Sequence, residues 1–321
     1  MPHSIFTRAL PVGALAFAVA SAPAQSTGTA RFTGPLVTPA VNTLPSGLFN
    51  IEPYLIHSNS RGDYDNTGGR HVASPQFRQW QIAVPMSYGI TDSFGIQVTP
   101  TAARTSGGGR HTDGLRLGDT GVRLQQRLLA PDDDGGGTVL AVAVARNFTT
   151  GKYHQLDANP LNATGSGAAR TTLAVGAQRL HWLEDGRALR WRSQVAWSPR
   201  PDRIRVRDAS VYGTDAGLRG YATPGQSWSA TFAAEYALDS RWVLVGEAIW
   251  NHNGAIHVRG VDARGGSIDH RLASGHAISL APAVEYHFNA NVGLIAGVQF
   301  TVAGRNVTDY VAPQAAVNMV F

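Results

Sequence analysis

The adjacent residues His57 and Ser58 combine a base with a hydroxyl group, the pair that nucleophilic acyl transfer requires within hydrogen-bond distance. Neighbouring side chains on an extended strand point to opposite faces, so these two groups would not meet there. Ser60 lies three residues from His57, which again places it on the opposite face, and no third residue that would orient the base can be identified. We therefore predict no catalytic residue, and a lipid-modifying enzyme is the third of three functional hypotheses.

Other motifs that could bind a metal or a phosphate lack the required spacing. Asp132-Asp133-Asp134 has neither the spaced ligands nor the closing Glu of a calcium loop. The run 107–109 of three glycines is not followed by the Lys-Ser/Thr of a phosphate loop. The chain has no cysteine, which excludes disulfides, thiolate zinc sites and cysteine nucleophiles. We predict no cofactor and no metal site, the latter also because tight ligand spacing is missing among the loop histidines His71, His111, His252, His257, His270 and His276.

Several segments alternate apolar residues with polar or ionisable residues at a period of two. In residues 228–238, Trp228, Phe232 and Tyr236 share one face, whereas Glu235 lies on the other. Such alternation predicts β-strands with one apolar and one polar face. A soluble β-sandwich has the same alternation, but its core would not tolerate so many ionisable groups. The wet or ion-paired interior of a membrane barrel would.

About twelve such strands can be placed, and their connections alternate in length. Short turns follow the even-numbered strands, and mostly long loops follow the odd-numbered ones. This layout is typical of bacterial outer-membrane barrels, in which the short turns are periplasmic. We predict an all-β fold, a transmembrane antiparallel up-and-down β-barrel of the bacterial outer-membrane type, with strands at about 48–57, 77–88, 93–104, 115–129, 138–149, 170–182, 188–198, 226–238, 241–251, 276–288, 291–303 and 311–321.

Aromatic residues lie near both ends of the apolar faces, as in the two girdles that flank the lipid-facing band of a barrel. From Trp228 to Tyr236, eight steps of about 3.3 Å at a tilt of about 40° span roughly 20 Å, close to the ~25 Å of that band. A terminal aromatic such as Phe321 is a familiar end of a last barrel strand. We expect the girdle to comprise Trp191, Trp197, Trp228, Tyr236, Trp242, Trp250, Tyr286 and Phe321.

Lipid offers no hydrogen-bond partner, so an open sheet edge is excluded and the last strand is expected to pair with the first. Prolines within the predicted strands conflict with this requirement, because each removes one N–H from the ladder. We expect several of these prolines, Pro53, Pro85, Pro100, Pro282 and Pro313, to lie at bulges or beside a lumen-facing kink.

The N-terminus predicts export. Residues 1–24 combine a weakly basic start, an apolar stretch from Ala9 to Ala20 and the small-residue site Ala22-Pro23-Ala24, as in a cleaved signal peptide. The apolar stretch is shorter than the ~18 residues that a membrane-spanning helix needs. We therefore predict a signal peptide over 1–24, a periplasmic or plug-like segment over 25–46 and a barrel over 47–321, located in the bacterial outer membrane.

Charge indicates which partners to expect. The formal net charge is +5, and the 27 basic residues, all arginine except Lys152, are scattered along the chain, which argues against nucleic-acid binding. One concentration, from Arg200 to Arg207, is either a basic extracellular hairpin that contacts lipopolysaccharide phosphates or a solvated extension of the preceding strand. The expected partners are outer-membrane lipids and lipopolysaccharide, the barrel-assembly machinery through the C-terminal strand, and an unidentified small solute.

Several short motifs precede and open the first predicted strands. They are Pro35-Leu36-Val37-Thr38-Pro39, Thr43-Leu44-Pro45-Ser46-Gly47, Glu52 within 50–54, Tyr88-Gly89-Ile90-Thr91-Asp92 before Phe94-Gly95-Ile96, and Leu117-Gly118-Asp119. Together these motifs resemble the outer-membrane transporter family assigned to a meta-pathway of phenol degradation. The resemblance implies a barrel with a role in the uptake of aromatic or other hydrophobic compounds, and no catalytic residues come with it.

The polar faces of the strands leave two interpretations open. They could line a narrow pore and set its selectivity, which predicts a channel that passes small, hydrophobic or aromatic solutes passively. The acidic and basic side chains of these faces could equally pair in salt bridges that fill the lumen. This predicts a closed structural or surface-interaction barrel. Residues 26–46 could hang in the periplasm or plug the lumen. The residues predicted to line the lumen are Glu52, Asp119, Arg123, Arg127, Arg190, Arg192, Gln194, Glu235, Glu247, Glu285, Gln299, Gln314 and Asn318.

Overall fold

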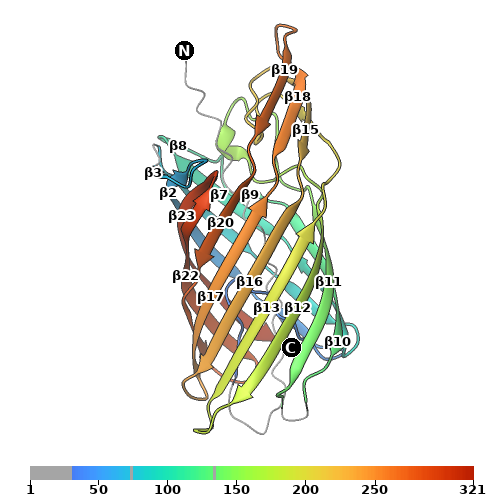
Figure 1. Ribbon diagram of the computed structural model, residues 1–321, viewed down its shortest axis with the longest axis vertical. Coiled ribbons are helices and arrows are strands. Elements are labelled where there is room, and N and C mark those ends of the chain that lie inside the picture. Colours follow the sequence, from blue (N-terminus) through green and yellow to red (C-terminus); the bar gives the residue numbers. More distant parts are fainter. Residues whose placement is uncertain (1–30, 73–74, 133–134) are drawn as a thin grey trace.

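The computed structural model describes residues 31–72, 75–132 and 135–321, and the signal-peptide prediction for residues 1–24 lies outside them. These residues form a closed antiparallel barrel of twelve strands, which confirms the predicted fold class (Figure 1). Five of the twelve strands consist of two consecutive elements. The elements of the barrel are β1 (Phe49–Ile51), β2 (Tyr54–Tyr64), β4 (Phe77–Ala83), β5 (Met86–Gly89), β6 (Phe94–Thr99), β7 (Thr101–Gly107), β9 (Arg116–Leu117), β10 (Thr120–Leu129), β11 (Thr138–Phe148), β12 (Thr171–Trp182), β13 (Ala188–Ser198), β16 (Ser227–Ala237), β17 (Trp242–Asn253), β20 (Gly275–Leu280), β21 (Ala283–His287), β22 (Val292–Arg305) and β23 (Val307–Val320).

The barrel closes between its first and last strands, as the absence of hydrogen-bond partners in lipid requires. β23 pairs with β1 through Asn50 and Val320, and with β2 through Tyr54 and Ala316. Every other strand pairs with its neighbours in sequence, so the topology is up-and-down. In the described part of the chain, no helix is long and apolar enough to cross a membrane.

Four of the five prolines lie where a strand is interrupted. Pro53, Pro85, Pro100 and Pro282 separate β1 from β2, β4 from β5, β6 from β7 and β20 from β21. Each of their carbonyl groups still accepts a bond from the adjacent strand, as in Glu52 N–H to Pro85 at 2.9 Å and Val84 N–H to Pro100 at 3.1 Å. The ladder thus loses one donor at each site while keeping its acceptor. Pro313 instead stays within β23, opposite Val298 of β22.

Short turns gather at one end of the barrel, which we call the short-turn end. In the turn between β16 and β17, the Asp239 carboxylate accepts bonds from the N–H groups of Arg241 (2.7 Å) and Trp242 (2.8 Å). These bonds lower the pKa of Asp239, because they stabilise its charged form. A side chain that replaces a turn hydrogen bond in this way is a common feature of tight turns containing Asp.

The opposite end, the long-loop end, is more ordered than the sequence predicts. Strands β2, β22 and β23 extend beyond their predicted ends, and β22 and β23 are joined by Asn306 alone, whose φ of 51° suits Asn. Small elements there are β3 (Arg70–Val72), β8 (Arg110–His111) and the 3-10 helix η1 (Pro160–Asn162).

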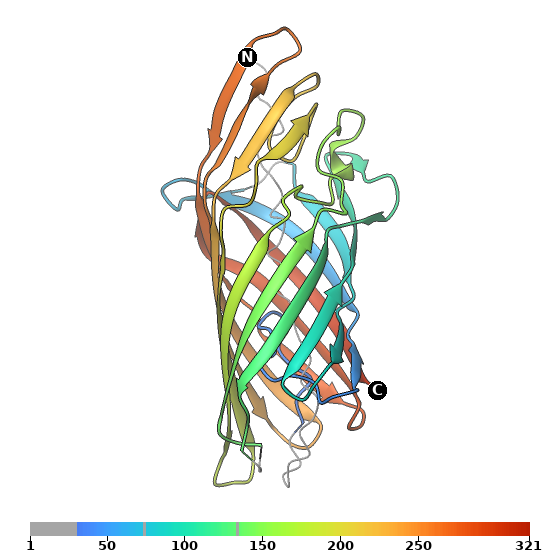
Figure 2. The same ribbon diagram turned by 90° about the vertical axis from the view of Figure 1, so that its right-hand side faces the viewer.

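The two longest predicted loops, 199–225 and 252–275, are not irregular. They contain the hairpin strands β14 (Ile204–Arg207), β15 (Arg219–Pro224), β18 (Ile256–Val261) and β19 (Ser267–Leu272), which make a second, four-stranded sheet (Figure 2). We call it the extension sheet, because it continues the barrel wall above β13, β16, β17 and β20. One face packs against the loop between β11 and β12, in a core that includes Tyr153, Val206, Tyr212 and Val258.

The alternation of the strands separates two environments. On β16, Phe232 points outward and is 48% exposed, whereas its neighbour Ala233 is fully buried inside. Because the outward face contacts lipid, an arginine near its middle should cost about 2–4 kcal/mol, but only about 0–1 kcal/mol near the membrane surface.

We therefore expect Phe232→Arg to lower the free energy of unfolding in lipid bilayers by about 2–4 kcal/mol, and Leu238→Arg, beside the short turn, by no more than about 1 kcal/mol. Urea titration of protein folded reversibly into phosphatidylcholine bilayers measures both. Equal costs at the two positions would contradict a lipid-facing band on this strand.

Candidate functional site

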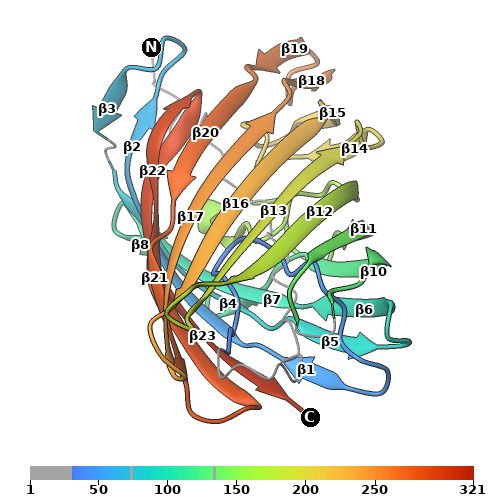
Figure 3. The same ribbon diagram turned by 60° about the horizontal axis from the view of Figure 1, so that its bottom comes forward.

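The lumen is occupied by the chain's own N-terminal part. Residues 31–46, the plug segment, have no regular secondary structure and enter the barrel before β1 begins (Figure 3). Residues 33–41 are all buried, and among them Thr38 is completely inaccessible. An irregular segment in such a place has N–H groups without partners in the segment itself, so the wall has to supply acceptors.

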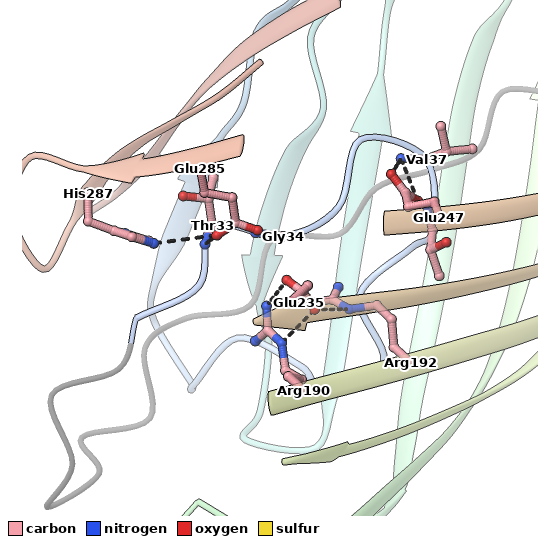
Figure 4. Close-up of polar contacts among 10 residues, drawn as sticks. Thr33, Gly34, Val37, Arg190, Arg192, Glu235, Glu247, Glu285 and His287 are labelled. Carbon is pink, nitrogen blue, oxygen red and sulfur yellow. Dashed lines mark hydrogen bonds and ion pairs between the residues drawn. The ribbon is translucent and has the colours of Figure 1, made fainter. Parts of the chain in front are cut away.

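Two wall glutamates supply these acceptors (Figure 4). Glu285 of β21 accepts bonds from the N–H groups of Thr33 (2.6 Å) and Gly34 (3.1 Å). Glu247 of β17 accepts bonds from Val37 N–H (3.1 Å to Oε1) and Thr38 N–H (2.7 Å to Oε2). Each carboxylate thus binds two consecutive amides. Hydrogen bonds to a charged acceptor are short and about twice as strong as neutral ones.

Further contacts hold the plug segment near the short-turn end. Gln125 donates to the Val41 carbonyl at 2.9 Å, and Arg127 donates to the Asn42 side-chain oxygen at 2.7 Å. Asp92, in the turn between β5 and β6, accepts a bond from Ser46 N–H at 2.9 Å. The segment is therefore bound along its whole described length and leads directly into β1.

A buried ion-pair cluster lies beside the plug segment. Glu235 accepts bonds from Arg190 at 2.8 Å (Nε) and 2.5 Å (Nη2), and from Arg192 at 3.1 Å (Nε), with all three side chains almost inaccessible (Figure 4). The Arg190 guanidinium also lies over the ring of Phe32, 4.2 Å from its centre. Burying such charges is tolerated only because each oxygen has donors, and removing one partner would leave an uncompensated charge.

An apolar region of the lumen packs against the other side of the plug segment. Leu36 and Val37 are buried in one cluster with side chains of the wall. Burial of an aliphatic side chain of this size contributes about 1.5–3 kcal/mol. The buried wall residues of this cluster include Tyr54, Ala83, Val243, Val245, Ile249, Ala283, Ile295 and Ala316.

The predicted lumen-lining residues divide into groups by what they contact. Glu52 is buried and accepts a bond from the Tyr54 hydroxyl at 3.1 Å. Arg123 donates to Gln194 at 2.9 Å. Glu235, Arg190 and Arg192 form the ion-pair cluster, and Glu247, Glu285 and Arg127 contact the plug segment. Of the remaining four, three lie at inward positions of β22 and β23, where Gln314 and Asn318 are buried and Gln299 is half-buried.

Asp119 lies apart from the other acids. It follows β9 at the long-loop end and binds the loop between β11 and β12 through Gly151 N–H (3.0 Å), Ser166 N–H (2.8 Å) and the Ser166 hydroxyl (2.9 Å). Asn147 adds a fourth bond at 3.2 Å. The carboxylate of Asp119 thus anchors this loop at the long-loop end.

The aromatic residues predicted as a girdle lie on the outward face in two rows. Trp197 and Trp228 contact each other across β13 and β16 with ring centres 5.9 Å apart, and Trp250 of β17 continues this row near the long-loop end. Near the short-turn end, Trp242 packs on Tyr286 at 4.7 Å. The other members of this second row are Trp191, Tyr236 and Phe321.

The remaining candidate motifs do not come together into a site. The His57 ring packs against Trp80 in a tilted arrangement with centres 4.1 Å apart, and adjacent Ser58 is paired in register with Gln79. Part of the run 132–134 lies outside the described residues. Across the ranges 31–72, 75–132 and 135–321, no group of three His, Asp or Glu side chains is arranged to hold a metal ion.

A small cavity lies between the plug segment and the wall. A cavity of about 20 Å³, lined by Thr43 and Leu44 of the plug segment and by Gln97, Arg123 and Gln125 of the wall, has room for about one water molecule. The plug segment thus lies against the wall here with a gap no larger than a water molecule.

The residues that sequence reasoning left unassigned are those of the plug segment that bind the wall. Thr33, Gly34, Val37 and Thr38 take part through their backbone, which carries no signal of its own in the sequence. The apolar residues Leu36, Val37, Val41 and Leu44 could have indicated a buried segment, because solvated segments without a core carry few such residues.

Comparisons with known proteins give the class of the fold. No family model matches the chain and no curated protein is similar to it, so membership of the phenol meta-pathway family stays a prediction. Among solved structures, an outer-membrane channel from Pseudomonas putida F1 is similar at 16% identity with a TM-score of 0.61, over 88% of this chain and 98% of that one. This likeness shows the fold, an outer-membrane β-barrel.

Two further structures align with lower scores. The transport unit of the autotransporter AIDA-I from Escherichia coli has a TM-score of 0.45 at 12% identity, over 86% of this chain and 91% of that one. A variant of the TodX monoaromatic hydrocarbon channel has a TM-score of 0.40 at 10% identity, over 86% of this chain and 90% of that one.

The paired acceptors of the plug segment predict a local response to mutation. Glu247→Gln replaces charged hydrogen bonds with weaker neutral ones, so exchange of the Val37 and Thr38 amides should accelerate by about tenfold. Exchange of the Thr33 and Gly34 amides should change little. Glu285→Gln should show the reverse pattern. Residue-resolved hydrogen–deuterium exchange of the folded protein measures both, and a uniform response to either variant would contradict the assignment of acceptors.

Proposed function

We propose that this chain is a channel of the bacterial outer membrane that passes small, hydrophobic or aromatic solutes by passive diffusion when the plug segment is displaced. The short-turn end then faces the periplasm and the extension sheet faces the outside, as is general for such barrels. No catalytic role is proposed for any residue.

The observation that carries the proposal is what fills the lumen. A closed barrel is filled by the side chains of its own wall. Here the filling is a separate segment, and much of the wall behind it carries small side chains. Ala143, Ala174 and Ala196 form one buried cluster across β11, β12 and β13, and Ala141 contacts Val41 of the plug segment in another. Removing the segment would therefore leave open space.

The way in which the plug segment is bound supports its displacement. Short hydrogen bonds to the wall run from its backbone amides to Glu247 and Glu285. After displacement, water could donate to the two carboxylates and accept from the released amides. The net stability of each such bond is about 1.5–3 kcal/mol. A segment without helix or strand structure can leave the lumen without breaking the ladder of the barrel.

The surface that displacement would uncover supports the solute class. Leu36 and Val37 cover an apolar region of the wall that includes Val245 and Ile249. Phe32 covers the Arg190 guanidinium, a cation that attracts the face of an aromatic ring. A small aromatic solute could occupy the same two environments as these side chains.

The similar Pseudomonas putida structure is described as an outer-membrane channel. At 16% identity this likeness establishes the fold alone, so the functional proposal rests on the lumen.

Planar-bilayer recording tests the channel. The wild-type protein should conduct weakly, and the double variant Glu247→Gln/Glu285→Gln should conduct several-fold more, because the plug segment is held less tightly. Deletion of residues 31–46 should give the largest conductance. Glu52→Gln is the matched control, since Glu52 also lies in the lumen but its bond is to Tyr54.

A barrel that stays silent after deletion of residues 31–46, while it is folded by its heat-modifiable mobility in gels, would refute the channel. An equal rise in conductance for Glu52→Gln would instead show that lumen charge, and not the plug segment, controls the current.

The solute class has its own test. In the protein lacking residues 31–46, benzyl alcohol should interrupt the ionic current transiently, whereas glycerol at the same concentration should not. Ile249→Asp should shorten these interruptions by about tenfold or more, because it places a charge in the apolar region. Interruptions of equal length for both solutes would exclude the proposed preference.

A closed structural barrel is the second candidate, and the Glu235 cluster favours it. This carboxylate is neutralised by Arg190 and Arg192 within the wall and takes no acceptor role toward the plug segment. Under this alternative the exposed long-loop end is the functional surface. None of the variants tested in planar bilayers, including the deletion of residues 31–46, would then conduct.

A further inference from the structure

The extension sheet has two faces of opposite character. Its inner face is apolar and packed, with Val206, Ala222 and Val258 completely buried. Its outer face is exposed and strongly basic. It carries one acid, Asp269, and six arginines, Arg203, Arg205, Arg207, Arg219, Arg259 and Arg271, together with His257 and Tyr221.

The register places these arginines side by side. Arg207 lies directly opposite Arg219 on the neighbouring strand, and Arg205, Tyr221 and Arg259 form the adjacent row. Arg203 lies over the Tyr221 ring, 4.4 Å from its centre. Neighbouring strands are about 4.8 Å apart, and like charges directly opposite one another destabilise a sheet. The arrangement therefore has an electrostatic cost within the protein.

The protein itself provides little compensation for this charge. Asp269 pairs with Arg259 at 3.0 Å. Within the described ranges, no acid lies within ion-pair distance of Arg205, Arg207, Arg219 or Arg271. Burial, followed by the charge of Arg207, lowers the pKa of His154 in the adjacent loop, so the positive potential also acts on a neighbouring group. An anion outside the protein would remove the repulsion.

The position of the face indicates which anion this is. β15 leads into β16, and Arg219 is nine residues from Trp228 of the aromatic row near the long-loop end. At about 3.3 Å per residue, Arg219 therefore lies at most roughly 30 Å from that row. The extension sheet stands above the barrel wall (Figure 2). The basic face thus lies beyond the aromatic row, on the side of the barrel where an outer-leaflet glycolipid would present its phosphates and acidic sugars.

We propose that the outer face of the extension sheet binds the phosphorylated core of lipopolysaccharide molecules surrounding the barrel. The arginine forks match phosphate oxygens in bidentate geometry, and their spacing over four strands allows one glycolipid to contact several of them. Bound glycolipid then neutralises the repulsion between Arg207 and Arg219 and fixes the extension sheet against the membrane. This inference does not depend on whether the lumen conducts.

The test uses the full protein, folded in non-ionic detergent, and purified rough-type lipopolysaccharide with a phosphorylated core. Native mass spectrometry counts the bound glycolipid. The triple variant Arg205→Gln/Arg207→Gln/Arg219→Gln should bind it at least about tenfold more weakly than the wild type. The corresponding lysine variant should lose less, because it keeps the charge but not the fork.

A matched control removes the same charge at the same end of the barrel. Arg78, Arg104 and Arg110 are exposed on β4, β7 and β8, away from the extension sheet, and their replacement by Gln should leave binding within about twofold of the wild type. Heat-modifiable mobility in gels verifies that every variant is folded.

Three results would overturn the proposal. One is equal loss of binding in the control triple variant, which would assign the affinity to overall charge. The second is equal binding of lipopolysaccharide whose phosphates have been removed with hydrofluoric acid. The third is tighter binding of a soluble polyanion, such as dextran sulfate, which would assign the face to a different partner.

Discussion

The structure depends on one constraint, namely that backbone amides need hydrogen-bond partners in surroundings that provide little water. In the wall, this constraint closes β23 onto β1 and β2 and confines four prolines to interruptions at which their carbonyls still accept bonds. In the lumen, the same constraint acts on a segment that has no strand or helix to satisfy its own N–H groups. Glu247 and Glu285 meet this need, so the glutamates act as acceptors for the main chain.

This role explains how a narrow barrel tolerates buried carboxylates. An unpaired buried charge is strongly destabilising, but each of these groups has donors aimed at it. Glu235 takes its donors from Arg190 and Arg192 of the wall, Glu52 takes one from Tyr54, and Glu247 and Glu285 take theirs from the plug segment. The wall and its plug are therefore coupled, since a departing segment leaves two carboxylates that water has to solvate.

The two ends of the barrel differ in how the chain connects its strands. At the short-turn end, tight turns such as the one at Asp239 reverse the chain with few residues. At the long-loop end, four strands continue past the aromatic row and become the extension sheet, with a packed core on one side and arginines on the other. Asp119 connects the barrel wall with the extension sheet, because its carboxylate binds the loop between β11 and β12 that packs on this core.

The sequence by itself determined the wall of the barrel. A period of two is a local property, and short turns and aromatic ends are local as well, so the strands, their faces and the barrel class could be predicted residue by residue. The inward positions of Glu235, Glu247 and Glu285 follow from the same alternation. Even the strand from 115 to 129, whose leucines could also suit a helix, follows it in β10.

Only the tertiary structure decided what these inward groups contact. The bonds between Thr33 and Glu285 join residues 252 positions apart, and their donors are backbone amides, which are the same in every residue. The loops 199–225 and 252–275 show the same limit, because β15 of one hairpin pairs with β18 of the other. Pairing partners distant in the chain leave no periodicity in the sequence. The choice between a periplasmic and a lumenal position for the plug segment, the four-stranded extension sheet and the contacts of Asp119 were therefore decided only in the folded molecule.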